Sequence, residues 1–131
     1  MDAAQALADL LEISSQIEAA VIVDEQGAVA GSTAGDGAAL ADAGRALLDQ
    51  AEAMRGSRPA QLEAATAEGS VFVLSDGKRT IVATTGSEAT VGLVFYDLKS
   101  CLRSVEPPNR RRKAATRKRA PRKKPEANDE T

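Results

Sequence analysis

Residues 19–32 read AAVIVDEQGAVAGS, two apolar runs separated by a short polar turn. The first run is dominated by β-branched residues, which favour extended strands. The turn Asp-Glu-Gln-Gly ends at Gly27, and glycine adopts a positive φ without steric cost. This stretch therefore predicts a β-hairpin with a four-residue connection.

Amphipathic helices are predicted on both sides of this hairpin. Over residues 3–14, leucines recur at the i, i+3 and i+4 spacing of a helix. A second helix is expected after Asp36, whose side chain can cap it, and should end near Arg55 because Gly56 follows. Its apolar face is predicted to comprise Leu40, Ala43, Leu47, Leu48, Ala51 and Met54.

Three further strands and a third helix complete the pattern. The strands are expected at residues 61–67, 70–75 and 80–85. Ser87 is interpreted as the cap of the last helix, which continues to residue 105 before two prolines. The order α-β-β-α-β-β-β-α predicts an α+β fold with a central five-stranded antiparallel sheet, flanked by helices on both faces.

Charge divides the 131 residues into two parts. Residues 1–105 contain 7 Lys/Arg and 15 Asp/Glu, whereas residues 106–131 contain 10 Lys/Arg and 4 Asp/Glu. We therefore expect one acidic domain over residues 1–105 and a basic tail over residues 106–131. The tail has no aromatic and almost no apolar residue, so it is predicted to be disordered.

The basic tail has several possible binding partners. Its cations are Arg110, Arg111, Arg112, Lys113, Arg117, Lys118, Arg119, Arg122, Lys123 and Lys124. They could bind DNA or RNA through counterion release, or an anionic membrane surface through lipid head groups. Binding to an acidic protein face, such as that of its own domain, and a purely solubilising role are the other interpretations.

The residue inventory argues against enzymatic chemistry. The chain has no histidine and one cysteine, which removes histidine acid–base catalysis and Cys/His zinc sites. The glycine-rich residues 31–37 lack the Lys-Ser/Thr that ends a phosphate-binding loop. We expect no catalytic residue, cofactor, metal or small-molecule substrate. Cys101 is interpreted as a half-buried small apolar residue.

The same inventory bears on location. A single cysteine fits a reducing compartment, and no run of about 20 apolar residues suggests a membrane span. The first ten residues lack the basic and apolar regions of a signal peptide. A cytoplasmic protein is therefore expected.

The ordered motifs together resemble the roadblock/dynein light chain domain family, in its bacterial type. The resemblance rests on AAVIVDEQGAVAGS, ALADAGRALLDQAEAM, GSVFVLSDGKRTIVATTG and ATVGLVFYDLKSCLRSV. It covers about residues 3–105, and the basic tail is an addition to the family pattern. It implies a five-stranded sheet with the second helix on one face and the terminal helices on the other.

The resemblance also implies a mode of action. Such domains usually form homodimers through the second helix and the third strand, joining two sheets edge to edge. Bacterial and archaeal members commonly bind or co-regulate small Ras-like GTPases without binding nucleotide themselves. A catalytic arginine cannot be assigned among Arg45, Arg55, Arg58 and Arg79, so binding is predicted rather than activation.

The residues themselves also favour self-association. The third strand would form a sheet edge, and unpaired edges need to be covered or paired. The predicted interface comprises Leu40, Ala43, Leu47, Gln50, Met54, Leu62, Ala64 and Thr66. The alternative is that the apolar members pack only on their own sheet. The leading interpretation is a homodimeric interaction module for a small GTPase, and the alternative is a nucleic-acid-associated protein acting through its tail.

Overall fold

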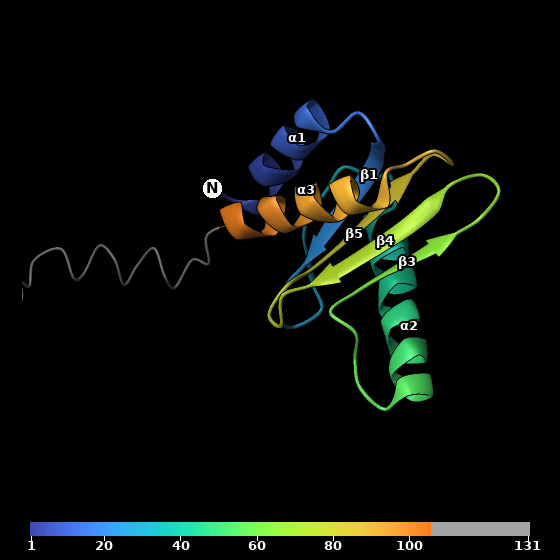
Figure 1. The fold of residues 1–131 in the computed structure, drawn as a ribbon. Coiled ribbons are helices and arrows are strands. Elements are labelled where there is room, and N and C mark those ends of the chain that lie inside the picture. The colour runs from blue at the N-terminus through green and yellow to red at the C-terminus, as the bar shows by residue number, and fades with distance from the viewer. Residues whose placement is uncertain (106–131) are drawn as a thin grey trace, which may run out of the picture.

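The computed structural model describes residues 1–105, and the predicted tail of residues 106–131 lies outside the described residues. The elements follow the predicted order (Figure 1). They are α1 (Ala3–Ile13), β1 (Ile17–Val23), β2 (Val29–Ser32), α2 (Gly37–Arg55), β3 (Gln61–Ala65), β4 (Ser70–Ser75), β5 (Thr80–Thr85) and α3 (Val91–Ser104). None of the helices in this range is long and apolar enough to cross a membrane.

The five strands form one antiparallel sheet in the order β2-β1-β5-β4-β3. The central strands β1 and β5 come from opposite ends of the domain, and β2 and β3 are the two edges. α1 and α3 cover one face of the sheet, whereas α2 covers the other (Figure 1). The predicted fold class and the expected division of the helices between the two faces are both confirmed.

The core has two halves because alternate strand residues point to opposite faces of the sheet. On the α1–α3 face, Phe72 is fully buried and meets Phe95 edge to face, with ring centroids 5.1 Å apart. On the α2 face, Val73 and Val82 pack with Leu48. Apart from this aromatic pair, the two halves consist almost entirely of aliphatic side chains.

The β1–β2 turn is held by its own side chain. The Asp24 carboxylate accepts hydrogen bonds from the Gln26 and Ala28 amides, both at 2.9 Å. Gly27 has a φ of 86°, the left-handed conformation that the sequence predicts for it. The hairpin is confirmed, but β1 begins earlier than expected, at Ile17, and β2 is displaced toward Ser32.

Helix boundaries were predictable where the cap is local. Asp36 accepts from the Ala39 amide at 3.0 Å, and Gly56 ends α2 with a φ of 82°. The prediction that Ser87 caps the last helix is wrong, because α3 begins at Val91. Its N-cap residue, Thr90, makes no side-chain cap, and its amide instead donates to Gln16 Oε1 at 2.6 Å.

Gly44 marks the closest approach of α2 to the sheet. A Cβ at this position would lie 3.0 Å from Val82 Cγ1 and closer still to Val82 Cγ2. Ala41 and Gly44 are buried on the chain's own sheet. This close packing fixes which flanks of α2 remain exposed.

Candidate interaction site

The predicted helix residues of the interface lie on one flank of α2. Leu40 and Leu47 are partly buried and pack against the core on the α2 face. Ala43 and Gln50 are exposed, and the Met54 side chain is 81% exposed. The two leucines therefore serve the chain's own core, while the other three residues present an exposed surface beside them.

The predicted strand residues meet this flank only in part. Leu62 packs against the same core as Leu47, and Ala64 is half-buried on the same side of β3. Thr66 lies beyond the end of the strand, where its hydroxyl donates to the Gly69 carbonyl at 2.8 Å. The structure thus brings Leu62 and Ala64 to the α2 face and places Thr66 in the β3–β4 turn.

β3 presents one edge of the sheet to solvent. Hydrogen bonds from Ser75 to the Ala60 carbonyl and from Thr66 to the Gly69 carbonyl, both 2.8 Å, set the phase of the β3–β4 ladder. Because hydrogen-bonded and non-hydrogen-bonded pairs alternate, Gln61, Glu63 and Ala65 direct their backbone groups away from β4. No other strand of the described domain pairs with them.

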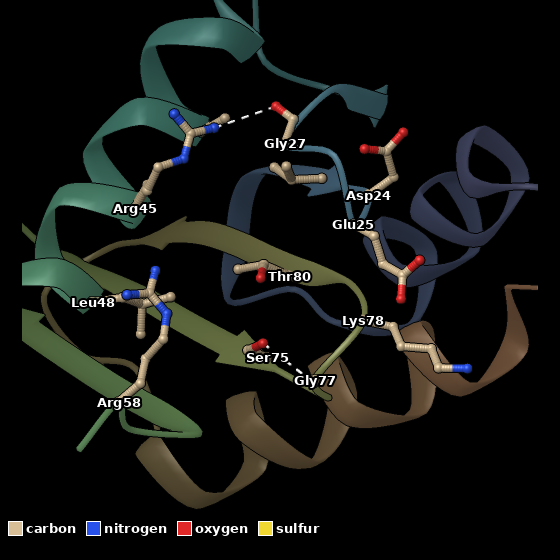
Figure 2. Close-up of a pocket in the computed structure, with 12 residues that line it drawn as sticks. Asp24, Glu25, Gly27, Arg45, Leu48, Arg58, Ser75, Gly77, Lys78 and Thr80 are labelled. Atoms are coloured by element: carbon tan, nitrogen blue, oxygen red, sulfur yellow. Dashed lines mark hydrogen bonds between the residues drawn. The ribbon is translucent and has the colours of Figure 1, made fainter. Parts of the chain in front are cut away.

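A cleft of about 440 Å³ opens on the other flank of α2 (Figure 2). Its floor is formed by Val23, Ala41 and Leu48, and its rim by the β1–β2 and β4–β5 turns. Arg45 reaches from α2 to this rim, donating to the Gly27 carbonyl and to Asp42, each at 3.3 Å. The cleft was not predictable from the sequence, because segments distant in the chain form it; the two glycine-bearing turns are its only local signal.

The second arginine that lines the cleft, Arg58, forms ion pairs with two carboxylates of α2. Arg58 donates through Nη1 to Asp49 at 2.8 Å and to Glu52 at 2.9 Å. Its hydrogen bonds to Asp49 and then Glu52 raise the pKa of its guanidinium. Arg58 therefore ties the loop after α2 to the helix.

A third arginine, Arg79, links the β4–β5 turn to the end of α3. Arg79 donates to the Val105 carbonyl at 2.7 Å and to Asp76 at 3.4 Å. Partial burial opposes ionisation of Asp76, but hydrogen bonds from the Arg79 and Lys78 amides outweigh it and lower the pKa of its carboxyl. With Arg45 and Arg58, three of the four arginines considered for catalysis hold the domain together.

The single cysteine, Cys101, lies on the opposite face of the sheet from α2. Burial, and secondarily the charge of Asp9, raises the pKa of Cys101 to about 11, which keeps it a thiol. Cys101 is 6% exposed, more deeply buried than predicted. Within residues 1–105, no group of acidic or cysteine side chains is arranged to hold a metal ion. The tail cations Arg110–Lys124 lie outside the described residues.

No protein-family model and no curated protein matches this chain. Solved structures do match it. Two structures of Roadblock/LC7 domains from Streptomyces avermitilis superpose with TM-scores of 0.63 and 0.67, at 21% and 18% identity. They cover 77% and 79% of this chain and 95% and 94% of their own. Myxococcus xanthus MglB superposes with a TM-score of 0.59 at 15% identity, covering 76% of this chain and 80% of its own.

These structures share the fold described above. The resemblance inferred from the sequence motifs points to the same group. The chain has the fold of a Roadblock/LC7 domain.

Proposed function

We propose that this protein is a non-catalytic, homodimeric interaction module that binds or co-regulates a small Ras-like GTPase. The observation that carries the proposal is the surface formed by the exposed flank of α2 and the open edge of β3. Leu47 of α2 and Leu62 of β3 both pack against the buried core on this face of the sheet. Within residues 1–105, no cluster of acidic or cysteine side chains is arranged to hold a metal ion.

Self-association would satisfy the unpaired edge of β3. Two copies meeting in an antiparallel arrangement would pair the backbone groups of Gln61, Glu63 and Ala65 with those of the partner subunit. Like charges directly opposite each other destabilise a sheet, so a register that pairs Glu63 with its own copy is disfavoured. Registers that place Gln61 or Ala65 opposite Glu63 avoid this repulsion. The exposed Ala43, Gln50 and Met54 would then flank the two-fold axis.

The structural matches are in keeping with an assembling module. A second MglB structure is described as having a tetrameric arrangement, and it superposes on this chain with a TM-score of 0.58. The GTPase part of the proposal comes from the family resemblance. Because Arg45, Arg58 and Arg79 already serve internal contacts, the proposal is limited to binding or co-regulation.

The dimer is tested with two charge insertions on α2. Ala43→Glu places a carboxylate on the proposed interface, and Ala53→Glu places the same charge on an exposed position elsewhere on the helix. Sedimentation velocity of the full chain should give a dimer for the wild type and Ala53→Glu, and a monomer for Ala43→Glu. A wild-type monomer at tens of micromolar, or equal effects of the two variants, would refute the dimer.

The GTPase is tested by capture. A tagged full chain should retain a small GTPase from lysate of its own cells, identified by mass spectrometry. The purified GTPase should then bind wild type in one nucleotide state more tightly than in the other. Ala53→Glu controls for nonspecific charge effects. Absence of any GTPase from the captured material would contradict this half of the proposal while leaving the dimer intact.

A further inference from the structure

α1 and α3 lie side by side and antiparallel on one face of the sheet (Figure 1). Three contacts fix their relative level. The Met1 nitrogen donates to the Ser104 carbonyl at 3.1 Å, Cys101 Sγ contacts the Ala6 carbonyl at 3.5 Å, and the Thr90 amide donates to Gln16 Oε1 at 2.6 Å.

Successive residues of a helix rise by about 1.5 Å, so these contacts predict which residues share a level. Between the Ala6–Cys101 and Gln16–Thr90 contacts, Asp9 lies level with Asp97, and Ile13 lies level with Leu93. Ile13 is about two turns beyond Ala6 on the same side of α1. Asp97 and Leu93 lie about one and two turns before Cys101 on α3.

The seam between the two helices is closed at one end and open at the other. Ala6 and Cys101 are 2% and 6% exposed, whereas Ile13 and Leu93 are 70% and 48% exposed. Ile13 and Leu93 are two of the seven large apolar side chains that are exposed within residues 1–105. We call the surface formed by Ile13 and Leu93 the open seam.

The charge beside the open seam is negative. Asp9 and Asp97 lie one turn along from Ile13 and Leu93, and Glu12 precedes Ile13. None of these carboxylates forms an ion pair with any residue of the described domain. Lys99, two residues after Asp97, projects from a different side of α3. An apolar surface with acidic neighbours favours a ligand that is apolar and basic.

We propose that the open seam docks a helical segment of a partner protein in which an apolar side chain is followed, one turn later, by Lys or Arg. The apolar side chain covers Ile13 and Leu93, and the cation lies between Asp9 and Asp97. The chain's own tail fits less well, because residues 110–124 supply ten cations but no Leu, Ile, Val, Met or aromatic residue. The open seam lies on the sheet face opposite α2, so this proposal is independent of the proposed dimer.

The probe is a fluorescein-labelled synthetic peptide of about 15 residues, long enough to form a helix. It carries Leu at helical spacing with Arg one turn after each Leu, and a matched peptide carries Glu in place of every Arg. Fluorescence anisotropy with the full chain should show the Arg peptide binding at least about tenfold more tightly than the Glu peptide. Equal affinity for both peptides would overturn the proposal.

Variants locate the binding site. Leu93→Ser and Ile13→Ser should each weaken binding about tenfold, the order expected for losing one buried apolar contact. Asp97→Asn should weaken it severalfold and reduce its dependence on salt. Val29→Ser, at a position of β2 that is 43% exposed and belongs to neither proposed surface, should have no effect. If Val29→Ser weakens binding as much as Leu93→Ser, the proposal fails.

A last variant tests the competing occupant. Replacing Arg110, Arg111 and Arg112 together by Gln removes the tail cations that are nearest to α3 in the sequence. Under the proposal, the affinity for the Arg peptide changes by less than about threefold, since only long-range repulsion is lost. A gain of more than about tenfold would show that the chain's own tail occupies the seam, and would overturn the proposal.

Discussion

Replacing Gly44 by alanine should destabilise the domain, although alanine is the better helix former. In an exposed helix position, alanine is favoured over glycine by about 1 kcal/mol. At Gly44, the added Cβ would stand 3.0 Å from one γ-methyl of Val82 and closer to the other. A change of Val82 rotamer cannot relieve both contacts, because the side chain is fully buried between α2 and the sheet.

The magnitude follows from comparing these two terms. Overpacking in a well-packed core costs about 1–3 kcal/mol, and a contact with two buried methyls belongs toward the upper end. After subtracting the gain in helix propensity, Gly44→Ala should lower the free energy of unfolding by about 1–2 kcal/mol. For a domain of this size, that corresponds to a loss of roughly 4–12 °C in Tm.

Urea unfolding of the full chain, followed by circular dichroism, measures the effect against two references. Ala46→Gly, at an exposed position of α2, reports the propensity term alone and should cost about 1 kcal/mol. In a Val82→Ala background, the two γ-methyls are absent, so Gly44→Ala should become stabilising. If Gly44→Ala stabilises the wild type, or if the Val82→Ala background leaves its effect unchanged, the packing argument is refuted.

Three further outcomes are expected. Folding lowers the pKa of Asp76, so its ionised carboxyl stabilises the fold at any pH above its ordinary pKa of 3.8. This stabilisation disappears as the pH falls through the lower pKa that the group has in the folded state. Asp76→Asn should therefore cost stability at pH 7 and much less at pH 2.5 in urea titrations. Cys101, with its pKa near 11, should react with a thiol reagent at pH 8 only after urea is added. The alternative of a nucleic-acid-binding tail predicts that random-sequence DNA binds the full chain with steep salt dependence and that deleting residues 110–124 abolishes binding; salt-independent or tail-independent binding would contradict that alternative.

The sequence could predict features whose cause lies within a few residues. The Asp24 turn, the Asp36 cap and the positive φ at Gly56 each depend on one residue and its nearest neighbours. The start of α3 was mispredicted because the Thr90 amide is held by Gln16, 74 residues away in the chain. Ser87 satisfies the usual composition of a helix cap, but that composition carries no information about a distant acceptor.

The candidate site shows the same division between local and distant causes. The apolar character of Leu40 and Leu47 was evident from periodicity, yet periodicity cannot separate a residue that packs on its own sheet from one that meets a partner. Met54 continues the same stripe and is nevertheless almost fully exposed. The roles of Arg58 and Arg79 were not predictable, because each guanidinium contacts groups brought close only by the folded chain.

The fold separates the surfaces to which we assign interactions. Arg79 holds the carbonyl of Val105, the last described residue, beside the β4–β5 turn at the C-terminal end of α3. The open seam lies at the other end of the same helix, about 20 Å away at 1.5 Å per residue. The α2–β3 surface is on the opposite face of the sheet. Because a sheet and a buried aliphatic core lie between them, a helical partner at the seam and a second copy at β3 would not compete for the same residues.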